Sequence, residues 1–130
     1  MTDISPLRSN SGGITFRAID TAMNVEPSVL QTIFTRFDAD RIMSEASALD
    51  GDAERRAGPL AGIMVSIKDL FDEKGQVTSA GSPILADGEP ASRDAIAVER
   101  LRAAGAIGCG RTAMSEFAYS GVGLNPHFGN

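Results

Sequence analysis

Several residue types are scarce in this sequence. It has no tryptophan and only one cysteine, one tyrosine and one histidine. With Cys109 alone no internal disulfide can form, which is typical of a protein from a reducing compartment. No stretch approaches the roughly 18–20 apolar residues of a membrane-spanning helix, and residues 1–6 lack the basic region and apolar core of a secretory signal. We therefore predict a cytoplasmic protein that does not bind a membrane.

Positive charge is also limited. The sequence has 12 lysines and arginines against 17 aspartates and glutamates, a formal net charge of −5. Nucleic-acid binding needs a basic patch, and none is visible in the sequence. Aromatic residues make up 5% of the chain, too few for stacking bases. The sequence thus argues against direct nucleic-acid binding.

The N-terminal part reads as helical. At 130 residues and 42% hydrophobic content the chain is long enough for one domain with a core. We expect a mobile tail over residues 1–13 and a helical segment over 14–57. Within that segment we predict a helix over 15–24 and a stretch over 29–37 that fits strand or helix equally. A second helix is capped by Asp38 and runs to Leu49, with Ile42, Ala46 and Leu49 on its buried face. A charged, mobile connection over 50–56 follows.

The C-terminal part, residues 58–130, reads as α/β. The apolar, β-branched run at 63–67 predicts a buried strand, and residues 106–110 are interpreted as a second short buried strand. Between them the pattern predicts a loop over 76–83 and then a helix. The features of that helix are a cap at Ser92 or Asp94, a buried face of Ile96, Val98, Leu101 and Ala104, and an end at Gly105. The order strand, helix, strand favours parallel pairing, and Met114 and Phe117 should pack from one side of a short helix.

Lys68 directly follows the first predicted strand. Burying an ammonium group without a partner costs several kcal/mol or lowers its pKa, so a lysine at the inner end of a core strand requires an explanation. One explanation is a buried ion pair with Asp69, Asp72 or another carboxylate. The other is a catalytic base. On the residues alone both interpretations stay open.

Other candidates for chemistry are weaker. Gly108–Ala113 matches the G-x-G-x-x-A dinucleotide fingerprint, but no acidic residue follows at the required distance. Cys109 has no histidine partner at a familiar spacing and is interpreted as a small buried hydrophobe. His127 cannot assemble a metal site alone, so no metal site is expected. Ser66 lies on the same strand face as Lys68, which makes a Ser–Lys dyad conceivable, although the strand holds the two tips apart.

Taken together, the motifs resemble the amidase signature family. Each is weak alone, but their order and spacing over residues 58–129 match the family's pattern. They are Gly58-Pro59-Leu60-Ala61-Gly62-Ile63, Val65-Ser66-Ile67-Lys68-Asp69, Thr78-Ser79-Ala80-Gly81-Ser82, Asp94-Ala95, Val98-Glu99-Arg100-Leu101, Ala104-Gly105-Ala106-Ile107, Gly110-Arg111-Thr112, Glu116-Phe117-Ala118 and Asn125-Pro126-His127-Phe128-Gly129. Residues 1–57 match only loosely.

The resemblance implies an amide hydrolase that uses a serine nucleophile, a second serine in a cis peptide, and a lysine. It places Lys68 as the general base and requires no cofactor. Both serines would lie downstream of Asn130, so this chain corresponds to an incomplete amidase signature fold, part of a mixed, largely parallel sheet flanked by helices. By position Tyr119, Ser120 and Gly121 would border the substrate pocket. The implied partners are a small-molecule amide and a homo-oligomer or a complementing C-terminal part.

Three positions depart from the family's usual residues. Met64 stands where proline is frequent, Arg111 where lysine is common, and Ala113 where asparagine is common. Ala113 removes a polar side chain near the implied site. The alternative to an amidase segment is a truncated, non-catalytic α/β domain that binds a partner chain or a small amide. A third hypothesis is a nucleotide-binding module built on Gly108 and Gly110.

Overall fold

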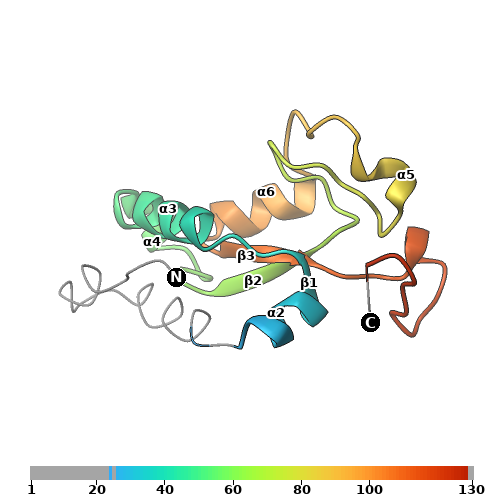
Figure 1. The fold of residues 1–130 in the computed structure, drawn as a ribbon. Coiled ribbons are helices and arrows are strands. Elements are labelled where there is room, and N and C mark those ends of the chain that lie inside the picture. Colours follow the sequence, from blue (N-terminus) through green and yellow to red (C-terminus); the bar gives the residue numbers. More distant parts are fainter. Residues whose placement is uncertain (1–23, 25, 129–130) are drawn as a thin grey trace.

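Three strands form a mixed sheet. The computed structural model describes Asn24 and residues 26–128 of the chain. Strands β1 (Phe34–Arg36), β2 (Met64–Lys68) and β3 (Ile107–Thr112) lie in the order β1-β3-β2. The central strand β3 pairs parallel with β2 and antiparallel with β1 (Figure 1). The predicted α/β class and the parallel pairing of the two main strands are confirmed.

The register between β2 and β3 sets where Lys68 lies. Val65 pairs with Gly108 but Ser66 pairs with Gly110, so β3 contains one extra residue at this point. Such a bulge bends a strand and re-aims the side chains that follow it. Beyond the bulge the ladder continues to Lys68 opposite Thr112, one residue further than predicted.

The helices flank this sheet. Figure 1 shows α3 and α6 on the upper side of the strands and α2 on the lower side. The helices and their bounds are α2 (Pro27–Ile33), α3 (Ala39–Asp50), α4 (Ala53–Arg56), α5 (Pro83–Ala86), α6 (Ile96–Ala103) and the short 3₁₀ helix η2 (Glu116–Ala118). None of the helices in the described residues is long and apolar enough to cross a membrane.

The core lies between α3 and the sheet. Ile42, Ala46 and Leu49 of α3 are buried together with Ile107 of β3. Asp38 caps the helix, because its carboxylate accepts a hydrogen bond from the Arg41 amide at 3.1 Å. The predicted cap and the predicted apolar face of this helix are both confirmed.

Local signals at helix starts explain three differences from the sequence prediction: a proline at the start of α2 and side-chain caps at α4 and α5. The ambiguous stretch 29–37 is divided: α2 begins at Pro27, where a missing amide costs nothing, and β1 follows at Phe34. The expected mobile connection contains α4, because Asp52 accepts from the Arg55 amide at 3.0 Å. Likewise Ser82, near the end of the expected loop, caps the short α5 that follows it. These caps are local and lie in polar segments that lack an apolar period.

The helix before β3 also differs in detail. Neither Ser92 nor Asp94 caps α6, whose N-cap is Ala95 without a side-chain hydrogen bond. Of the four residues expected on its buried face only Val98 is buried, and Ile96 is 67% exposed. The helix ends at Ala103 with Ala104 as its C-cap, and the predicted stop, Gly105, follows with a φ of +94°.

Two further expectations concern the packing of Met114 with Phe117 and the N-terminal residues. Met114 is buried as predicted, but Phe117 in η2 is exposed, so the two do not form one packing face. The predicted tail (1–13) and the helix over 15–24 lie outside the described residues, apart from Asn24. The division of the chain at residue 58 stays a prediction.

Candidate active site

Lys68 is the last residue of β2, and the chain turns directly after it. Its carbonyl accepts hydrogen bonds from the amides of Leu70 at 2.6 Å and Phe71 at 3.1 Å. Its side chain is exposed, so the expected burial is wrong for the described part of the chain. The strand period of two explains this result, because Ile67 takes the buried position and its neighbours Ser66 and Lys68 the exposed ones.

The expected carboxylate partners of Lys68 are occupied elsewhere. Asp69 binds Arg111, and Asp72 accepts a hydrogen bond from the Thr78 hydroxyl at 2.9 Å. Within residues 26–128 no ion pair or hydrogen bond engages the Lys68 amine. The ion-pair interpretation of Lys68 is therefore not supported by the described structure.

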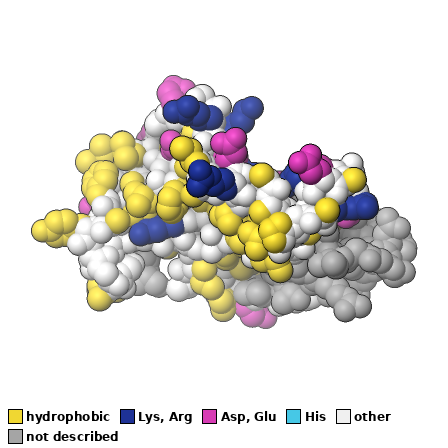
Figure 2. Space-filling view, turned by 180° about the vertical axis from the view of Figure 1, so that it is seen from behind, with side chains coloured by type: hydrophobic (Ala, Val, Ile, Leu, Met, Phe, Trp, Pro, Cys, Tyr) yellow, Lys and Arg dark blue, Asp and Glu magenta, His cyan; other side chains and the backbone are white. Residues whose placement is uncertain are grey.

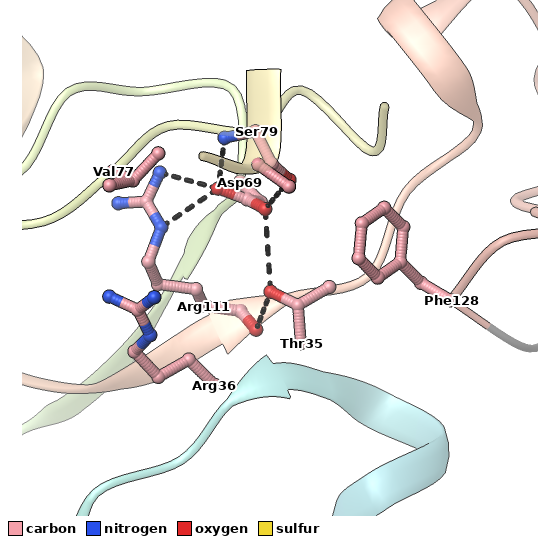
Figure 3. Close-up of a pocket in the computed structure, with 8 residues that line it drawn as sticks. Thr35, Arg36, Asp69, Val77, Ser79, Arg111 and Phe128 are labelled. Atoms are coloured by element: carbon pink, nitrogen blue, oxygen red, sulfur yellow. Dashed lines mark hydrogen bonds and ion pairs between the residues drawn. The ribbon is translucent and has the colours of Figure 1, made fainter. Parts of the chain in front are cut away.

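Asp69 is the buried carboxylate next to this lysine. Its Oδ1 accepts hydrogen bonds from Nε of Arg111 at 2.9 Å and from Nη2 of the same side chain at 2.7 Å. Ser79 donates its amide to Oδ1 and its hydroxyl to Oδ2, and Thr35 donates its hydroxyl to Oδ2 at 3.4 Å. Figure 3 shows these side chains converging on Asp69 from three segments. Both oxygens are thus fully engaged by donors.

A pocket opens beside this carboxylate. Its lining comes from β1, β3, the segment after β2, α5 and the C-terminal loop, with Phe128 facing Thr35 in Figure 3. Arg36 lies at the pocket and donates to the Gln76 side chain at 2.7 Å. Lys68 does not line this pocket. The anchored carboxylate and the exposed amine therefore lie in different surroundings although they are adjacent in sequence.

The anchor extends into a larger buried network centred on Glu73. This side chain is 2% exposed and accepts hydrogen bonds from Arg41 of α3, from Arg102 of α6 at 2.6 Å and from Arg111 of β3 at 3.2 Å. Glu45 of α3 binds Arg41 and Arg102 as well. Charges removed from water need such partners, so the network joins the segment after β2 to both helices and the central strand.

The charged side chains of the network shift the pKa values of their partners. Burial raises the pKa of Asp94, but hydrogen bonds from Arg102 and from the Lys74 amide outweigh it, and the pKa lies below the ordinary value. Burial lowers the pKa of Arg102, but Asp94 and Glu45 more than compensate and raise it. Both groups are therefore charged at neutral pH.

The candidate substrate residues lie on the loop after η2. Tyr119 is 97% exposed, and Ser120 and Gly121 are exposed as well. Among the described residues no hydrogen bond joins any of the three to Lys68 or to the pocket; the hydroxyl of Ser120 accepts from the amide of Val122. Their role stays a prediction.

Asn125 organises the loops beyond the strand ends and could be found in the sequence only as part of a motif. Its amide nitrogen donates to the carbonyls of Gly81 at 2.7 Å and Met114 at 2.8 Å. The two loops also meet where the Phe117 amide donates to the Ala80 carbonyl at 2.8 Å, and both of these residues have positive φ. Positive φ in residues other than glycine costs free energy and concentrates at functional sites.

The other sequence candidates do not assemble a site. Gly108 and Gly110 lie within β3, which continues to Thr112, so no helix opens after the glycines as a dinucleotide fingerprint requires. Cys109 is half-buried, and burial raises the pKa of its thiol. Nε2 of His127 lies 3.9 Å from Oε2 of Glu116. The described residues contain no cluster suited to a metal ion.

The family follows from a direct comparison. The family model described as Amidase matches residues 14–130, nearly the whole chain. The chain belongs to the amidase family. The resemblance inferred from the spaced motifs is confirmed, and the match extends further toward the N-terminus than the motifs did.

Curated relatives include components of amide-processing enzymes. AtzE of Pseudomonas sp. (strain ADP), a subunit of 1-carboxybiuret hydrolase, is 43% identical over 100 residues, which cover 74% of this chain and 21% of the relative. The A subunit of the glutamyl-tRNA(Gln) amidotransferase of Cupriavidus necator is 39% identical over 106 residues, 81% of this chain and 21% of the relative. The chain therefore spans about a fifth of the length of these relatives.

Solved amidase structures share the fold. A structure described as a vestigial protein complex that reveals the evolutionary origins of an s-triazine catabolic enzyme has a TM-score of 0.79 and 36% identity, covering 97% of this chain and 28% of that chain. A structure described as an amidase has a TM-score of 0.72 and 30% identity, covering 95% and 28%. The mixed sheet with its helices is thus part of an amidase fold.

Proposed function

We propose that this chain supplies the general base of an amide-hydrolysing enzyme, and that Lys68 is that base. The observation that carries the proposal is the placement of Lys68: its main chain is fixed by the β2–β3 ladder and by the turn after it, while its amine is exposed and engages no described group. A lysine that must accept and return protons needs a fixed main chain and an amine that is not engaged in an ion pair.

The mechanism follows the family's Ser-cisSer-Lys chemistry. A neutral Lys68 takes a proton from the serine nucleophile through the bridging serine, and later returns it to the leaving ammonia or amine. Neither serine is assigned to these 130 residues, so we expect this chain to be inactive alone.

The remaining roles belong to the same proposal. Tyr119, Ser120 and Gly121 border the amide substrate, and no cofactor is required. Two relatives are named as subunits, which supports a complementing chain or segment, or a second copy, as the partner. Cytoplasmic location is part of the proposal and rests on the single cysteine.

The test uses an extended chain, defined as residues 1–130 of this protein followed by the part of the Pseudomonas relative that lies beyond its matching segment. Lys68→Met should abolish ammonia release from carboxylic amides. The matched control is Lys74→Met, since Lys74 is the other lysine of the sequence and is also exposed. Retained activity in Lys68→Met contradicts the proposal, as does an equal loss in both variants.

A second candidate function is a non-catalytic domain that binds a partner chain or a small amide. It is favoured by large apolar side chains that stay exposed around α5 and the loop after η2, and Figure 2 shows hydrophobic side chains on the face opposite to that of Figure 1. The exposed residues are Ile84, Leu85, Phe117, Tyr119, Val122 and Leu124. Assaying ammonia release by the 130-residue chain with and without the complementing C-terminal fragment separates the two functions.

A further inference from the structure

Asp69 is held by hydrogen bonds of both its main chain and its side chain. Its amide donates to the Thr112 carbonyl at 3.2 Å, and its carbonyl accepts from the Ala80 amide at 2.9 Å. Its carboxylate binds Arg111 through two nitrogens and accepts from Ser79 and Thr35 as described above. The main chain and the side chain of Asp69 are therefore both fixed, by partners in β1, in β3 and in the loop at residues 79–80.

We propose that Asp69 and Arg111 are positioning residues for Lys68: their buried ion pair fixes the main chain from which the exposed amine extends. This inference rests on the proposed function. The β2–β3 ladder holds Lys68 from its N-terminal side up to its own pairing with Thr112. The Asp69 anchor holds it from the C-terminal side, where the chain would otherwise leave the sheet as a free turn.

The geometry requires a charged carboxylate. Every group that contacts the two oxygens is a donor, and Arg111 is 2% exposed. Without the carboxylate, Arg111 would keep Glu73 at 3.2 Å and the Phe71 carbonyl at 2.9 Å, and could follow either away from β2. The residue after Lys68 would lose its side-chain bonds to Arg111 of β3 and to Ser79, so the end of β2 would be held less firmly.

The composition of the chain offers a direct test. Lys68 and Lys74 are the only lysines, so ¹⁵N-lysine labelling of the 130-residue chain gives two backbone amide signals. The Lys74 amide donates to the Asp94 carboxylate at 2.7 Å, at the other end of the charged network. Each lysine thus has its own aspartate anchor, and each serves as the control for the other.

Order parameters of the two amides are the measurement. In Asp69→Ala the value for Lys68 should fall from about 0.85, typical of rigid backbone, to below about 0.6, while that for Lys74 is unchanged. In Asp94→Ala the reverse is expected. Asp69→Asn keeps the shape of the side chain without its charge, and the Lys68 order parameter in this variant tests the inference if Asp69→Ala does not fold. An unchanged Lys68 signal in both Asp69 variants, or an equal loosening of both lysines, overturns the inference.

Activity provides the second readout, in the extended chain. Asp69→Asn and Arg111→Met should lower kcat by about 100-fold with KM unchanged, since small misplacement of a catalytic group has effects of this size. Arg111→Lys, which keeps the charge, should recover most of the loss. Asp94→Asn, which weakens the distant end of the network, should stay within about twofold of the unmodified chain.

The outcomes separate the two proposals. If Lys68→Met retains activity, the assignment of the base is wrong. If Lys68→Met is inactive but Asp69→Asn behaves like Asp94→Asn, Lys68 is the base and the positioning inference alone is wrong. A loss of kcat in Asp69→Asn that follows only the lowered fraction of folded protein would also contradict positioning.

Discussion

Replacing Glu73 by glutamine tests how much the buried network contributes to stability. The substitution removes one negative charge that three arginines share, with its bond to Arg102 at 2.6 Å and to Arg111 at 3.2 Å. Glutamine keeps the size of the side chain but presents an NH₂ group to donors. Breaking a buried ion pair costs roughly 3–5 kcal/mol. The cost should not exceed this range, because each arginine keeps a second carboxylate.

The expected loss converts into a melting temperature. Unfolding entropy of about 2.1 cal/mol/K per residue gives about 0.27 kcal/mol/K for 130 residues, so 3–5 kcal/mol corresponds to a decrease of about 11–18 °C. Urea denaturation followed by circular dichroism measures the free energy directly, with an unchanged m-value. The control is Glu89→Gln, at an exposed position. A loss below about 1 kcal/mol, equal to that control, would refute the reasoning.

Two further predictions concern acid and backbone strain. The folded-state pKa of Asp94 lies below its ordinary 3.8, so the contribution of this carboxylate to the free energy of unfolding is present above pH 3.8 and is lost as pH falls through the folded pKa. Urea denaturation between pH 5 and 2 should show this loss of stability in the unmodified chain and a smaller loss in Asp94→Asn. Gly105→Ala should destabilise by at least about 2 kcal/mol, since φ is +94° and a Cβ would lie 2.4 Å from the Arg55 carbonyl oxygen. Gly75→Ala is the control, because Gly75 has a φ of +78° but open space around it, so that this substitution adds backbone strain without a steric clash. An equal loss of unfolding free energy in Gly105→Ala and Gly75→Ala would contradict the steric argument.

The sequence allowed β2, β3 and the main helix α3 to be predicted, the strands from short apolar runs and the helix from an apolar period with a cap, whereas β1 lay in a stretch that fitted strand or helix equally. Asp38 followed by Ile42, Ala46 and Leu49 specifies both the start and the buried face of α3. The helices α4 and α5 could not be found in this way. Each is four residues long, and each depends on one cap, Asp52 or Ser82, in a polar or small-residue stretch.

The candidate site was predictable only in part. A motif identified Lys68, but nothing in the local sequence distinguishes a buried from an exposed lysine at a strand end. That outcome depends on the pleat, in which Ile67 takes the buried side. The network around Glu73 was missed for a different reason. Its arginines lie 29 to 38 residues away in sequence, and such contacts have no local signature.

The contrast between Lys68 and Asp69 is the main functional result of the structure. Two adjacent charged residues would be expected to neutralise each other, and a lysine bound to its neighbour could not serve as a base. Two features keep them apart: Asp69 is buried whereas Lys68 is exposed, as the alternation along an extended chain requires, and Arg111 binds the Asp69 carboxylate through two nitrogens. The carboxylate is thereby committed to the core, and the Lys68 amine stays available. If Lys68 is the base, as proposed, Arg111→Met should lower kcat, whereas Arg111→Lys, which keeps a positive charge beside Asp69, should recover most of the loss.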